Sequence, residues 1–232
     1  QDIQLPNSGF EDWYTDSDGL PKPAKDASSS FWDCGNVNYF GKHIMTTQND
    51  ETALGQGSSV KMETQETMKI IAAGNIFTGT FERDGMGGIL TLGRNFECRP
   101  NKLKGYYKYT SAKVSVSKGH LNEGEDDLCS LYIALTDEQI TVNTNKGIYF
   151  DPNSSAVIAY GSISDEESKG ADSFKEFTVD LEYKDLKRIP KYIIVVASSS
   201  KYGDYMEGGK GSTMWLDDLE LVYPKSMEEV RK

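Results

Sequence analysis

Cysteine and histidine are scarce in this chain, and their scarcity excludes several kinds of site. The 232 residues include three cysteines, Cys34, Cys98 and Cys129, and two histidines, His43 and His120. The cysteines are too few for a disulfide framework, form no C-x-x-C pair, and leave at least one thiol free. We therefore interpret them as small buried hydrophobic residues. Two histidines far apart in the sequence do not predict a zinc site, and nothing further supports a Ser-His-Asp triad.

Basic residues and long apolar runs are also in short supply. The chain has 25 Lys and Arg against 36 Asp and Glu, a formal net charge of −11. This charge disfavours sequence-independent binding to nucleic acid and adhesion to anionic lipid. The apolar runs are too short to insert into a membrane as helices. Neutral glycans remain compatible partners, because stacking and hydrogen bonds hold sugars and net charge does not.

Helix signals are few, whereas strand signals recur from residue 58 onward, separated by Gly, Asn and Asp turns. The segment 66–73 has some helical character, but its Ile-Ile pair and the Gly-Asn pair that follows favour strand and turn. The expected strands are 59–64, 69–73, 75–82, 89–93, 103–117, 128–136, 156–163, 174–182, 192–199 and 213–223. Many short strands with almost no helix predict an all-β, two-sheet sandwich.

The chain shows no repeat or linker, so we expect one domain over residues 1–232. Residues 14–30 are polar, rich in turn-forming types and without periodicity, which predicts a long surface loop. Residues 224–232 are expected to form a C-terminal tail, with a short helix or a frayed end over 226–232. The runs 126–135 and 193–197 carry apolar residues on both faces, which is typical of strands at the centre of a sheet.

The last predicted strand contains a carboxylate on an apolar face. Read with a period of two, one face carries Trp215, Asp217, Leu219, Leu221 and Tyr223. We expect this face, with its tryptophan, to lie in the core. A carboxylate in a core is costly unless hydrogen bonds or a cation compensate it.

The segment 7–13, near the start of the chain, places Glu11 between two aromatic residues, Phe10 and Trp13. We assign Trp13 to the core. We also expect the first and last strands to lie side by side, which would bring Glu11 to Asp217.

Four segments in this order resemble a known family, the Bacteroidota putative carbohydrate metabolism domain. They are Leu5–Trp13, Phe31–Asn36, Phe96–Pro100 and Leu103–Tyr109. The Asn-x-Gly-Phe-Glu start and the Asp-Asp strand at the end also resemble the jelly-roll carbohydrate-binding modules. The resemblance implies a jelly-roll β-sandwich with adjacent termini, in an exported and often lipid-anchored protein. The sequence shows no signal peptide, and its Gln-Asp start is similar to that of a chain whose leader was removed.

In those modules a Glu, an Asp and backbone carbonyls hold a structural calcium ion. By this resemblance, Glu11 and Asp217 would be ligands here, with carbonyls from the turn at Asn7 and the strand at Lys61. Calcium takes about 6–8 oxygen ligands, which such a group can supply with water. The alternative is that Glu11 is exposed and that Asp217 accepts backbone N–H bonds at a bulge.

Aromatic residues suggest where a sugar would bind. An aromatic ring covers the apolar face of a sugar ring, and neighbouring polar side chains bind its hydroxyls. We expect stacking first on the tryptophan of the turn-rich segment 31–36 and next on the tyrosines of 103–109. A rim is expected in the glycine-rich loop 200–212, whose residues 203–212 we expect to be mobile. The candidate residues are Trp32, Asp33, Asn36, Arg99, Tyr107, Tyr109 and Tyr202. The alternative is that these aromatic rings pack in the core.

Three functions remain open. We predict a non-catalytic glycan-binding domain of an exported surface protein that takes part in polysaccharide utilisation. A glycoside hydrolase is the first alternative, but among 36 acidic residues the sequence does not select the required carboxyl pair. A structural or adhesion module with a protein partner is the second. The Gly203–Gly208 spacing does not predict a phosphate loop, because Gly209 stands where lysine is required and a strand follows.

Overall fold

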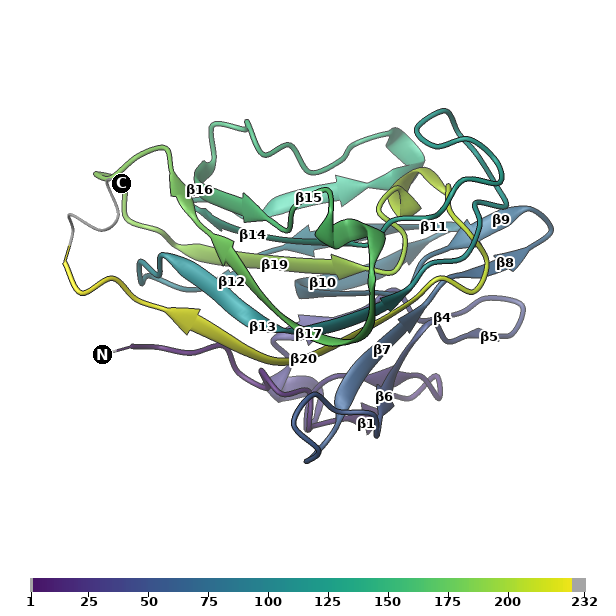
Figure 1. Cartoon of the computed structure of the whole chain (residues 1–232), viewed down its shortest axis with the longest axis horizontal. Coiled ribbons are helices and arrows are strands. Elements are labelled where there is room, and N and C mark those ends of the chain that lie inside the picture. Colours follow the sequence, from purple (N-terminus) through teal and green to yellow (C-terminus); the bar gives the residue numbers. More distant parts are fainter. Residues whose placement is uncertain (1, 227–232) are drawn as a thin grey trace.

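The computed structural model describes residues 2–226, which form two layers of β-strands (Figure 1). Residues 227–232, with most of the expected helical or frayed end, lie outside this range. The elements are β1 (Tyr14–Thr15), β2 (Pro21–Lys22), η1 (Ala27–Ser29), β3 (Trp32–Asp33), β4 (Val37–Asn38), β5 (Lys42–His43), β6 (Thr46–Asn49), β7 (Ser59–Glu63), β8 (Gln65–Thr67), β9 (Ile70–Ala72), β10 (Asn75–Asp84), β11 (Gly87–Leu92), β12 (Arg94–Asn95), β13 (Lys102–Thr110), β14 (Ser130–Thr136), β15 (Ile140–Asn143), η2 (Thr144–Lys146), β16 (Val157–Ser162), η3 (Glu167–Lys169), β17 (Ala171–Asp180), β18 (Glu182–Tyr183), β19 (Tyr192–Ser198), η4 (Gly203–Tyr205) and β20 (Thr213–Val222). Between residues 2 and 226, no helix is both long enough and apolar enough to span a membrane.

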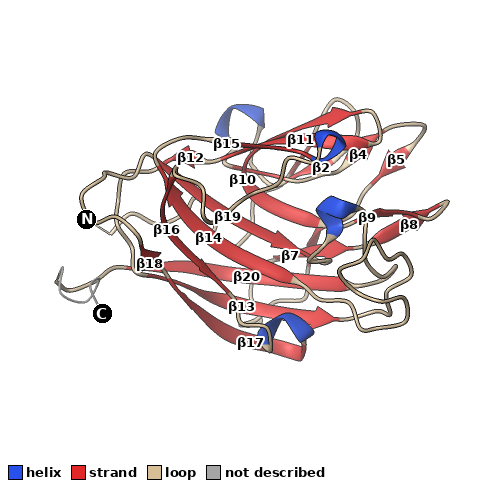
Figure 2. Cartoon of the chain, turned by 90° about the horizontal axis from the view of Figure 1, so that it is seen from above, coloured by secondary structure: helices blue, strands red, loops and turns tan. Residues whose placement is uncertain are grey.

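Two antiparallel sheets face each other (Figure 2). The larger sheet has the order β15-β11-β10-β19-β14-β16-β18, with β3 also paired to β10 and β12 to β19. The smaller sheet has the order β17-β13-β20-β7-β6, and three two-stranded hairpins, β1–β2, β4–β5 and β8–β9, complete the fold. The predicted all-β, two-sheet jelly-roll sandwich is confirmed.

Alternation along the strands produces the main core between the two sheets. On β14, Leu131, Ile133 and Leu135 point into this core, and Ile193 and Val195 do so on β19. The opposite face of the larger sheet carries a second cluster, the outer cluster, formed by Phe77, Leu90, Leu92, Ala134, Val142 and Ile194. The strands β14 and β19 are therefore apolar on both faces and central in their sheet, as their sequences predict.

The outer cluster exists because the larger sheet folds back on itself halfway along β10. Residues 75–77 of β10 pair with β19, whereas residues 79–84 pair with β11. At the change, Gly79 has φ 145°, and a Cβ there would collide with the carbonyl oxygen of Thr91. Only glycine tolerates both conditions. The strands β11 and β15, at one edge of the larger sheet, thus pack over the outer face of β14 and β19 and form one wall of a cleft.

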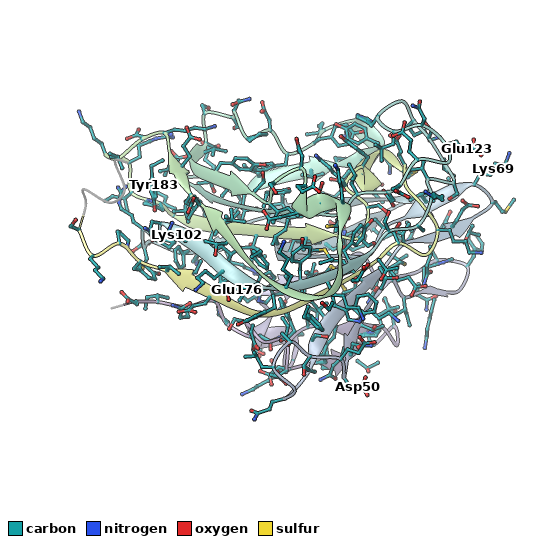
Figure 3. The ribbon with its side chains drawn as sticks, viewed as in Figure 1. Asp50, Lys69, Lys102, Glu123, Glu176 and Tyr183 are labelled. Atoms are coloured by element: carbon teal, nitrogen blue, oxygen red, sulfur yellow. The ribbon has the colours of Figure 1, made fainter. Side chains whose placement is uncertain are left out.

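The outer face of the smaller sheet is polar. Cross-strand ion pairs join Lys102 to Asp180 at 2.6 Å and Lys104 to Glu176 at 3.1 Å. Figure 3 shows Lys102 and Glu176 at separate points along these strands. Exposed pairs of this kind contribute little stability, and this face has the solvated character of an ordinary surface.

A β-bulge divides β20, so the residues on each face of this strand differ from those predicted for a regular strand. Before the bulge, Met214 and Leu216 lie in the main core; after it, Leu219 does. The register with β13 shifts at this point, and Asp218 has φ 47°. Trp215 is buried, at 8% exposed, as expected of a core residue, but it lies on the outer face of the sheet, under the ammonium groups of two lysines, and not in the main core. Trp13, by contrast, packs against the main core as expected.

The N-terminal segment lies beside β20. The side chain of Gln4 donates to the carbonyl of Leu221 at 2.8 Å and accepts its N–H at 2.7 Å. The N–H of Leu219 donates to the carbonyl of Ser8 at 3.0 Å. Residues 3–8 and 219–223, near the two ends of the described chain, therefore lie side by side, as expected. Residues 2–13 are not a strand, however, because side-chain bonds replace much of the backbone ladder.

The expected loop at 14–30 contains more structure than its composition predicts. Residues Tyr14–Thr15 and Pro21–Lys22 pair as a hairpin, and Leu20 is buried beside them. Its polar turn residues serve the hairpin: the carboxylate of Asp16 accepts the N–H groups of Asp18 and Leu20. The expected strand 103–117 ends at Thr110, where the sequence suggested a bend.

Candidate functional site

Trp32 lies in the core. Its side chain is among the most deeply buried, with the residue 1% exposed, and its ring N–H donates to the carbonyl of Pro6 at 2.8 Å. Phe10 packs edge-on against it, with ring centroids 5.2 Å apart. Neither face of the indole is open, so the prediction that Trp32 stacks on sugar is wrong.

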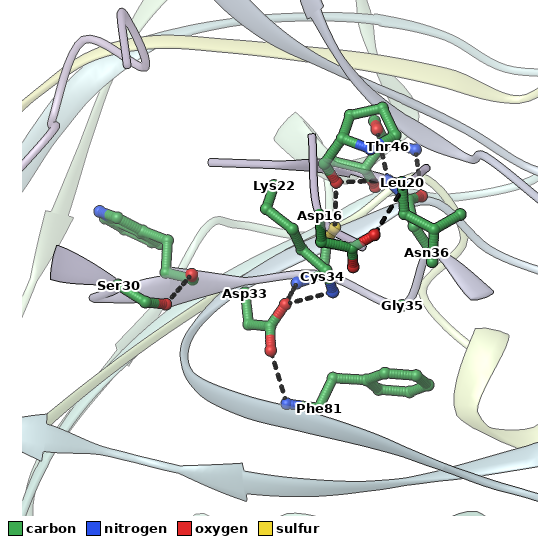
Figure 4. Close-up of polar contacts among 12 residues, drawn as sticks. Asp16, Leu20, Lys22, Ser30, Asp33, Cys34, Gly35, Asn36, Thr46 and Phe81 are labelled. Atoms are coloured by element: carbon green, nitrogen blue, oxygen red, sulfur yellow. Dashed lines mark hydrogen bonds and ion pairs between the residues drawn. The ribbon is translucent and has the colours of Figure 1, made fainter. Parts of the chain in front are cut away.

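Asp33 and Asn36 hold the segment 31–36 in place (Figure 4). Asn36 is buried; its amide donates to the carbonyl of Thr46 at 2.8 Å, and its oxygen accepts the N–H groups of Met45 and Thr46. The carboxylate of Asp33 accepts the N–H of Phe81 at 2.8 Å and pairs with Lys22 at 2.9 Å. The polar atoms expected to bind hydroxyls are thus engaged within the protein.

Tyr107, Tyr109 and Arg99 also have structural roles. The two tyrosines are 1% exposed, and their hydroxyls donate to the carbonyls of Glu167 and Ser199 at 2.9 and 2.8 Å. Burial raises the pKa of Tyr107 to about 12. The guanidinium of Arg99 donates to a backbone carbonyl, that of Arg188. The alternation noted in the sequence placed these tyrosines on one face of β13, and that face is the core face.

Tyr202 lies at an open cleft on the outer face of the larger sheet. This hollow, which we call the aromatic cleft, has a volume of about 270 Å³. Six aromatic side chains line it, and Ser130, Asp165, Lys201 and Asp204 add polar groups. The aromatic residues are Tyr132, Tyr149, Phe150, Tyr160, Tyr202 and Tyr205.

The aromatic rings form a connected wall. His120 stacks on Tyr202 with centroids 4.4 Å apart and contacts Tyr205 at 4.3 Å. Tyr149 stacks on Tyr205 at 4.1 Å, and deeper in the cleft Tyr132 stacks on Phe150 at 4.8 Å. Sequence reasoning missed Tyr132, although it alternates with the core residues of β14 and therefore points to the outer face.

The loop 199–212, which carries Tyr202 and Asp204, is fixed by two buried carboxylates. Asp127 accepts the hydroxyls of Ser200 and Ser212 at 2.7 and 2.8 Å and the N–H of Gly209 at 2.8 Å. Glu207 accepts the N–H of Leu121 at 2.8 Å and contacts His120 Nδ1 at 2.7 Å. The expectation of a mobile loop is wrong, because its backbone is tied to buried groups.

Two carboxylates of the loop 199–212, Glu207 and Asp204, have opposite pKa shifts. Burial alone would raise the pKa of Glu207, but the N–H donors of Leu121 and His120 outweigh it and lower the pKa. Asp204 is exposed to the cleft, yet the walls displace bulk water around it, which raises its pKa. The carboxyl group of Asp204 can therefore hydrogen-bond a ligand hydroxyl from the wall of the cleft.

Three carboxylates meet where the chain ends approach each other, and we call them the acidic group: Glu11, Asp217 and Asp218. The loop 50–58 binds two of them, because Ser58 N–H donates to Glu11 at 2.8 Å and Ala53 N–H donates to Asp217 Oδ2 at 3.0 Å. Asp217 is 1% exposed, and within residues 2–226 its Oδ1 atom has no hydrogen-bond partner. Burial, followed by the charges of Asp218 and Glu11, raises the pKa of Asp217 to about 6.

The expected carbonyl ligands are placed differently. Asn7 uses its side chain to bond the backbone of Asp12, and its carbonyl accepts the N–H of Phe10 at 2.9 Å. Lys61 lies in β7, which is paired with β20 on one side and β6 on the other, so its carbonyl faces a neighbouring strand. No cluster of three or more His, Cys, Asp or Glu placed to hold a metal occurs in the described part of the chain. The unpartnered Asp217 oxygen, however, is an atom that a cation would satisfy.

An all-β sandwich whose open cleft combines aromatic rings with polar groups is the architecture of a carbohydrate-related domain. The sequence matches the putative carbohydrate metabolism domain over residues 9–222, and the chain belongs to this family. The family resemblance found in the sequence is thereby confirmed. No curated protein matches the chain.

Two solved structures share the fold. A putative glycoside hydrolase from Bacteroides thetaiotaomicron has a TM-score of 0.62 and 25% identity, and the match covers 79% of this chain and 58% of that one. A putative glycoside hydrolase from Bacteroides vulgatus has a TM-score of 0.63 and 22% identity, with 96% and 95% covered. The chain thus spans just over half the length of the first structure.

Proposed function

We propose that this chain is a non-catalytic glycan-binding domain of an exported surface protein, and that the aromatic cleft binds the sugar. The observation that carries the proposal is the set of six aromatic side chains around one open hollow, with seven polar residues among them. Membership of a carbohydrate metabolism family supports it. A role in polysaccharide utilisation and export to the cell surface are parts of the same proposal.

In this proposal the aromatic rings and the polar groups make different contacts with the sugar. Tyr202 and Tyr205 stand at the cleft with their backbone fixed, so they offer apolar surface at little cost in conformational entropy. Asp204 and Lys201 supply a carboxyl group and an ammonium group for ring hydroxyls. The net charge of −11 favours neutral or cationic glycans over acidic ones.

The test is a glycan array followed by calorimetric titration of the best oligosaccharide. Replacing Tyr202 with alanine removes one stacking ring, and we expect the affinity to fall about tenfold, or about 1.4 kcal/mol. Tyr106→Ala is the matched control, because Tyr106 lies on β13 beside the core-facing Tyr107 and does not line the aromatic cleft. Equal affinities for wild type and Tyr202→Ala, in a folded protein, would contradict the proposal.

Glycoside hydrolysis is the second candidate, and the pKa of Asp204 favours it. A general acid for this reaction needs a raised pKa and a second carboxyl group across the bond. Asp204 has the first property, and Asp165 lines the same cleft. Release of reducing sugar that is lost in Asp204→Asn would support hydrolysis; binding without release supports the non-catalytic function.

A structural calcium ion at the acidic group is part of the proposal. Glu11, Asp217 and Asp218 supply carboxylate oxygens, and the buried, unpartnered Asp217 oxygen supports a cation there. Such an ion would hold the N-terminal segment, the loop 50–58 and β20 together.

A further inference from the structure

A second hollow adjoins the aromatic cleft, and its walls are apolar. It has a volume of about 400 Å³ and lies between three hairpins, β4–β5, β8–β9 and β10–β11. We call it the apolar groove. Its floor and walls include Met45, Ile71, Phe81 and Leu90. Arg83 closes one side by lying over the ring of Tyr39, 4.4 Å from its centroid.

The tip of each hairpin presents a large apolar side chain to solvent. Phe40 is 95% exposed, Met68 is 91% exposed and Met86 is 63% exposed, and all three line the groove. Figure 3 shows Lys69, which follows Met68 at its hairpin tip, at one end of the molecule. An isolated exposed hydrophobic residue is ordinary, but three around one hollow mark a binding surface.

At two of these tips the backbone conformation disfavours a large side chain. Phe40 has φ 53° and Met68 has φ 51°, the left-handed region where glycine or asparagine is favoured. A bulky residue there costs about 1 kcal/mol and leaves its side chain in water, where it contributes nothing to the core. The packing of the core therefore does not explain why these side chains are large and apolar.

The groove and the aromatic cleft adjoin each other at Asp204. Asp204 lines both hollows, and a smaller hollow between them shares Leu90 and Gly203 with the groove and Tyr132 and Lys201 with the cleft. A ligand in the cleft can therefore extend into the groove. The volume of the groove suits a small molecule, whereas a stable protein contact needs about 800 Å² of surface from each partner.

We propose that the apolar groove binds an acyl or aryl substituent carried by the glycan whose sugar occupies the aromatic cleft. This inference rests on the proposed function, because it extends the same site. Methionine side chains adapt to chains of different shape, so Met68 and Met86 suit an occupant that varies in length. The ligand would thus be amphipathic, with hydroxyls read near Asp204 and an apolar end enclosed by the hairpins.

The experiment compares methyl and octyl glycosides of glucose, galactose and maltose by calorimetric titration below their micelle concentrations. We expect the octyl glycoside of a bound sugar to bind at least tenfold more tightly than its methyl glycoside. The double variant Met68→Ser/Met86→Ser should lose most of this gain. The matched controls Leu54→Ser and Ile189→Ser change residues 63% and 66% exposed that do not line the groove, and they should keep it.

Each other outcome overturns the inference in a recognisable way. If methyl glycosides bind through Tyr202 and the octyl group adds nothing, the glycan-binding function stands and the groove has no such role. If octyl glycosides bind equally well after Tyr202→Ala and octanol alone binds as tightly, both proposals fail. If sedimentation shows a dimer that Met68→Ser/Met86→Ser converts to a monomer, the groove is a contact between two copies. Because the substituted residues are exposed, the variants should keep the wild-type melting temperature.

Discussion

At the scale of single residues, Asp127 contributes most clearly to the shape of the cleft. Its side chain is fully buried, and Oδ2 alone accepts from Ser200, Ser212 and Gly209. Asp127→Asn puts an amide donor or an uncharged oxygen against these three donors. We expect the free energy of unfolding, measured in urea, to fall by about 3 kcal/mol.

The neighbouring residue provides the control for this substitution. Asp126 is exposed and pairs with Lys113, also exposed, at 2.5 Å. Because exposed ion pairs contribute about 0–1 kcal/mol, Asp126→Asn should change stability little. Equal losses in the two variants would show that the buried network does not anchor the loop.

Trp32 and Tyr202 show why the aromatic cleft, the proposed sugar site, could not be located from the sequence. Trp32 stands among turn-forming residues, which suggested an exposed ring, but Asp33 and Asn36 are there to bond the backbone of β10 and β6. A buried hydrogen-bond network has the same composition as a polar loop. Tyr202 was identified because its loop is rich in glycine, whereas Tyr149 and Tyr160 come from separate strands and loops that only the fold brings together.

At the scale of elements, the bulge in β20 decides which side chains face the core. Asp218 occupies the left-handed region there, with φ 47°. Asp218→Gly and Asp218→Ala both remove the charge. The difference between their free energies of unfolding therefore measures the cost of the left-handed backbone conformation. We expect the glycine variant to be about 1 kcal/mol more stable than the alanine variant in chemical unfolding. A more stable alanine variant would mean that the bulge relaxes when the aspartate is lost.

The long strands could be predicted because each has a period-two or continuous apolar pattern bounded by turn residues. The bulge could not, since Trp215, Leu219 and Leu221 read as one uninterrupted face in a regular strand. One added residue transfers the tryptophan to the opposite side. The two-residue strands at 14–15 and 21–22 lie below the length at which periodicity is detectable.

At the scale of the whole molecule, the acidic group links stability to pH, and the proposed calcium ion would add a dependence on calcium. The folded-state pKa of Asp217 is about 6, above its usual 3.8, so the protonated carboxyl stabilises the fold below pH 3.8 and this contribution is lost as pH rises through 6. We therefore compare the melting temperatures of wild type and Asp217→Asn in the presence of a chelator. As pH rises from 4 to 7, the melting temperature of wild type should fall relative to that of the variant. Millimolar calcium at pH 7 should raise it by several degrees, since saturation at 100 times Kd adds about 2.7 kcal/mol.

Asp217→Asn is also the control for calcium, because it keeps an acceptor for the Ala53 N–H and removes one charge. Its melting temperature should respond weakly to the ion. If calcium does not raise the melting temperature of wild type, or raises that of Asp217→Asn by as much, the result would argue against a metal at the chain ends. The sequence predicted that Glu11 and Asp217 would meet, but the third carboxylate, Asp218, joins them only because the bulge turns it towards Glu11.

The anchoring of the loop 199–212 has a consequence for how this binding surface can change. Its backbone is held from below by Asp127 and Glu207, while the rings of Tyr202 and Tyr205 project from it into the cleft. Structural and recognition roles thus fall to different side chains of one loop. Substitutions at the rings can alter ligand preference without weakening the framework, so related chains are free to diversify their ligands on an unchanged scaffold.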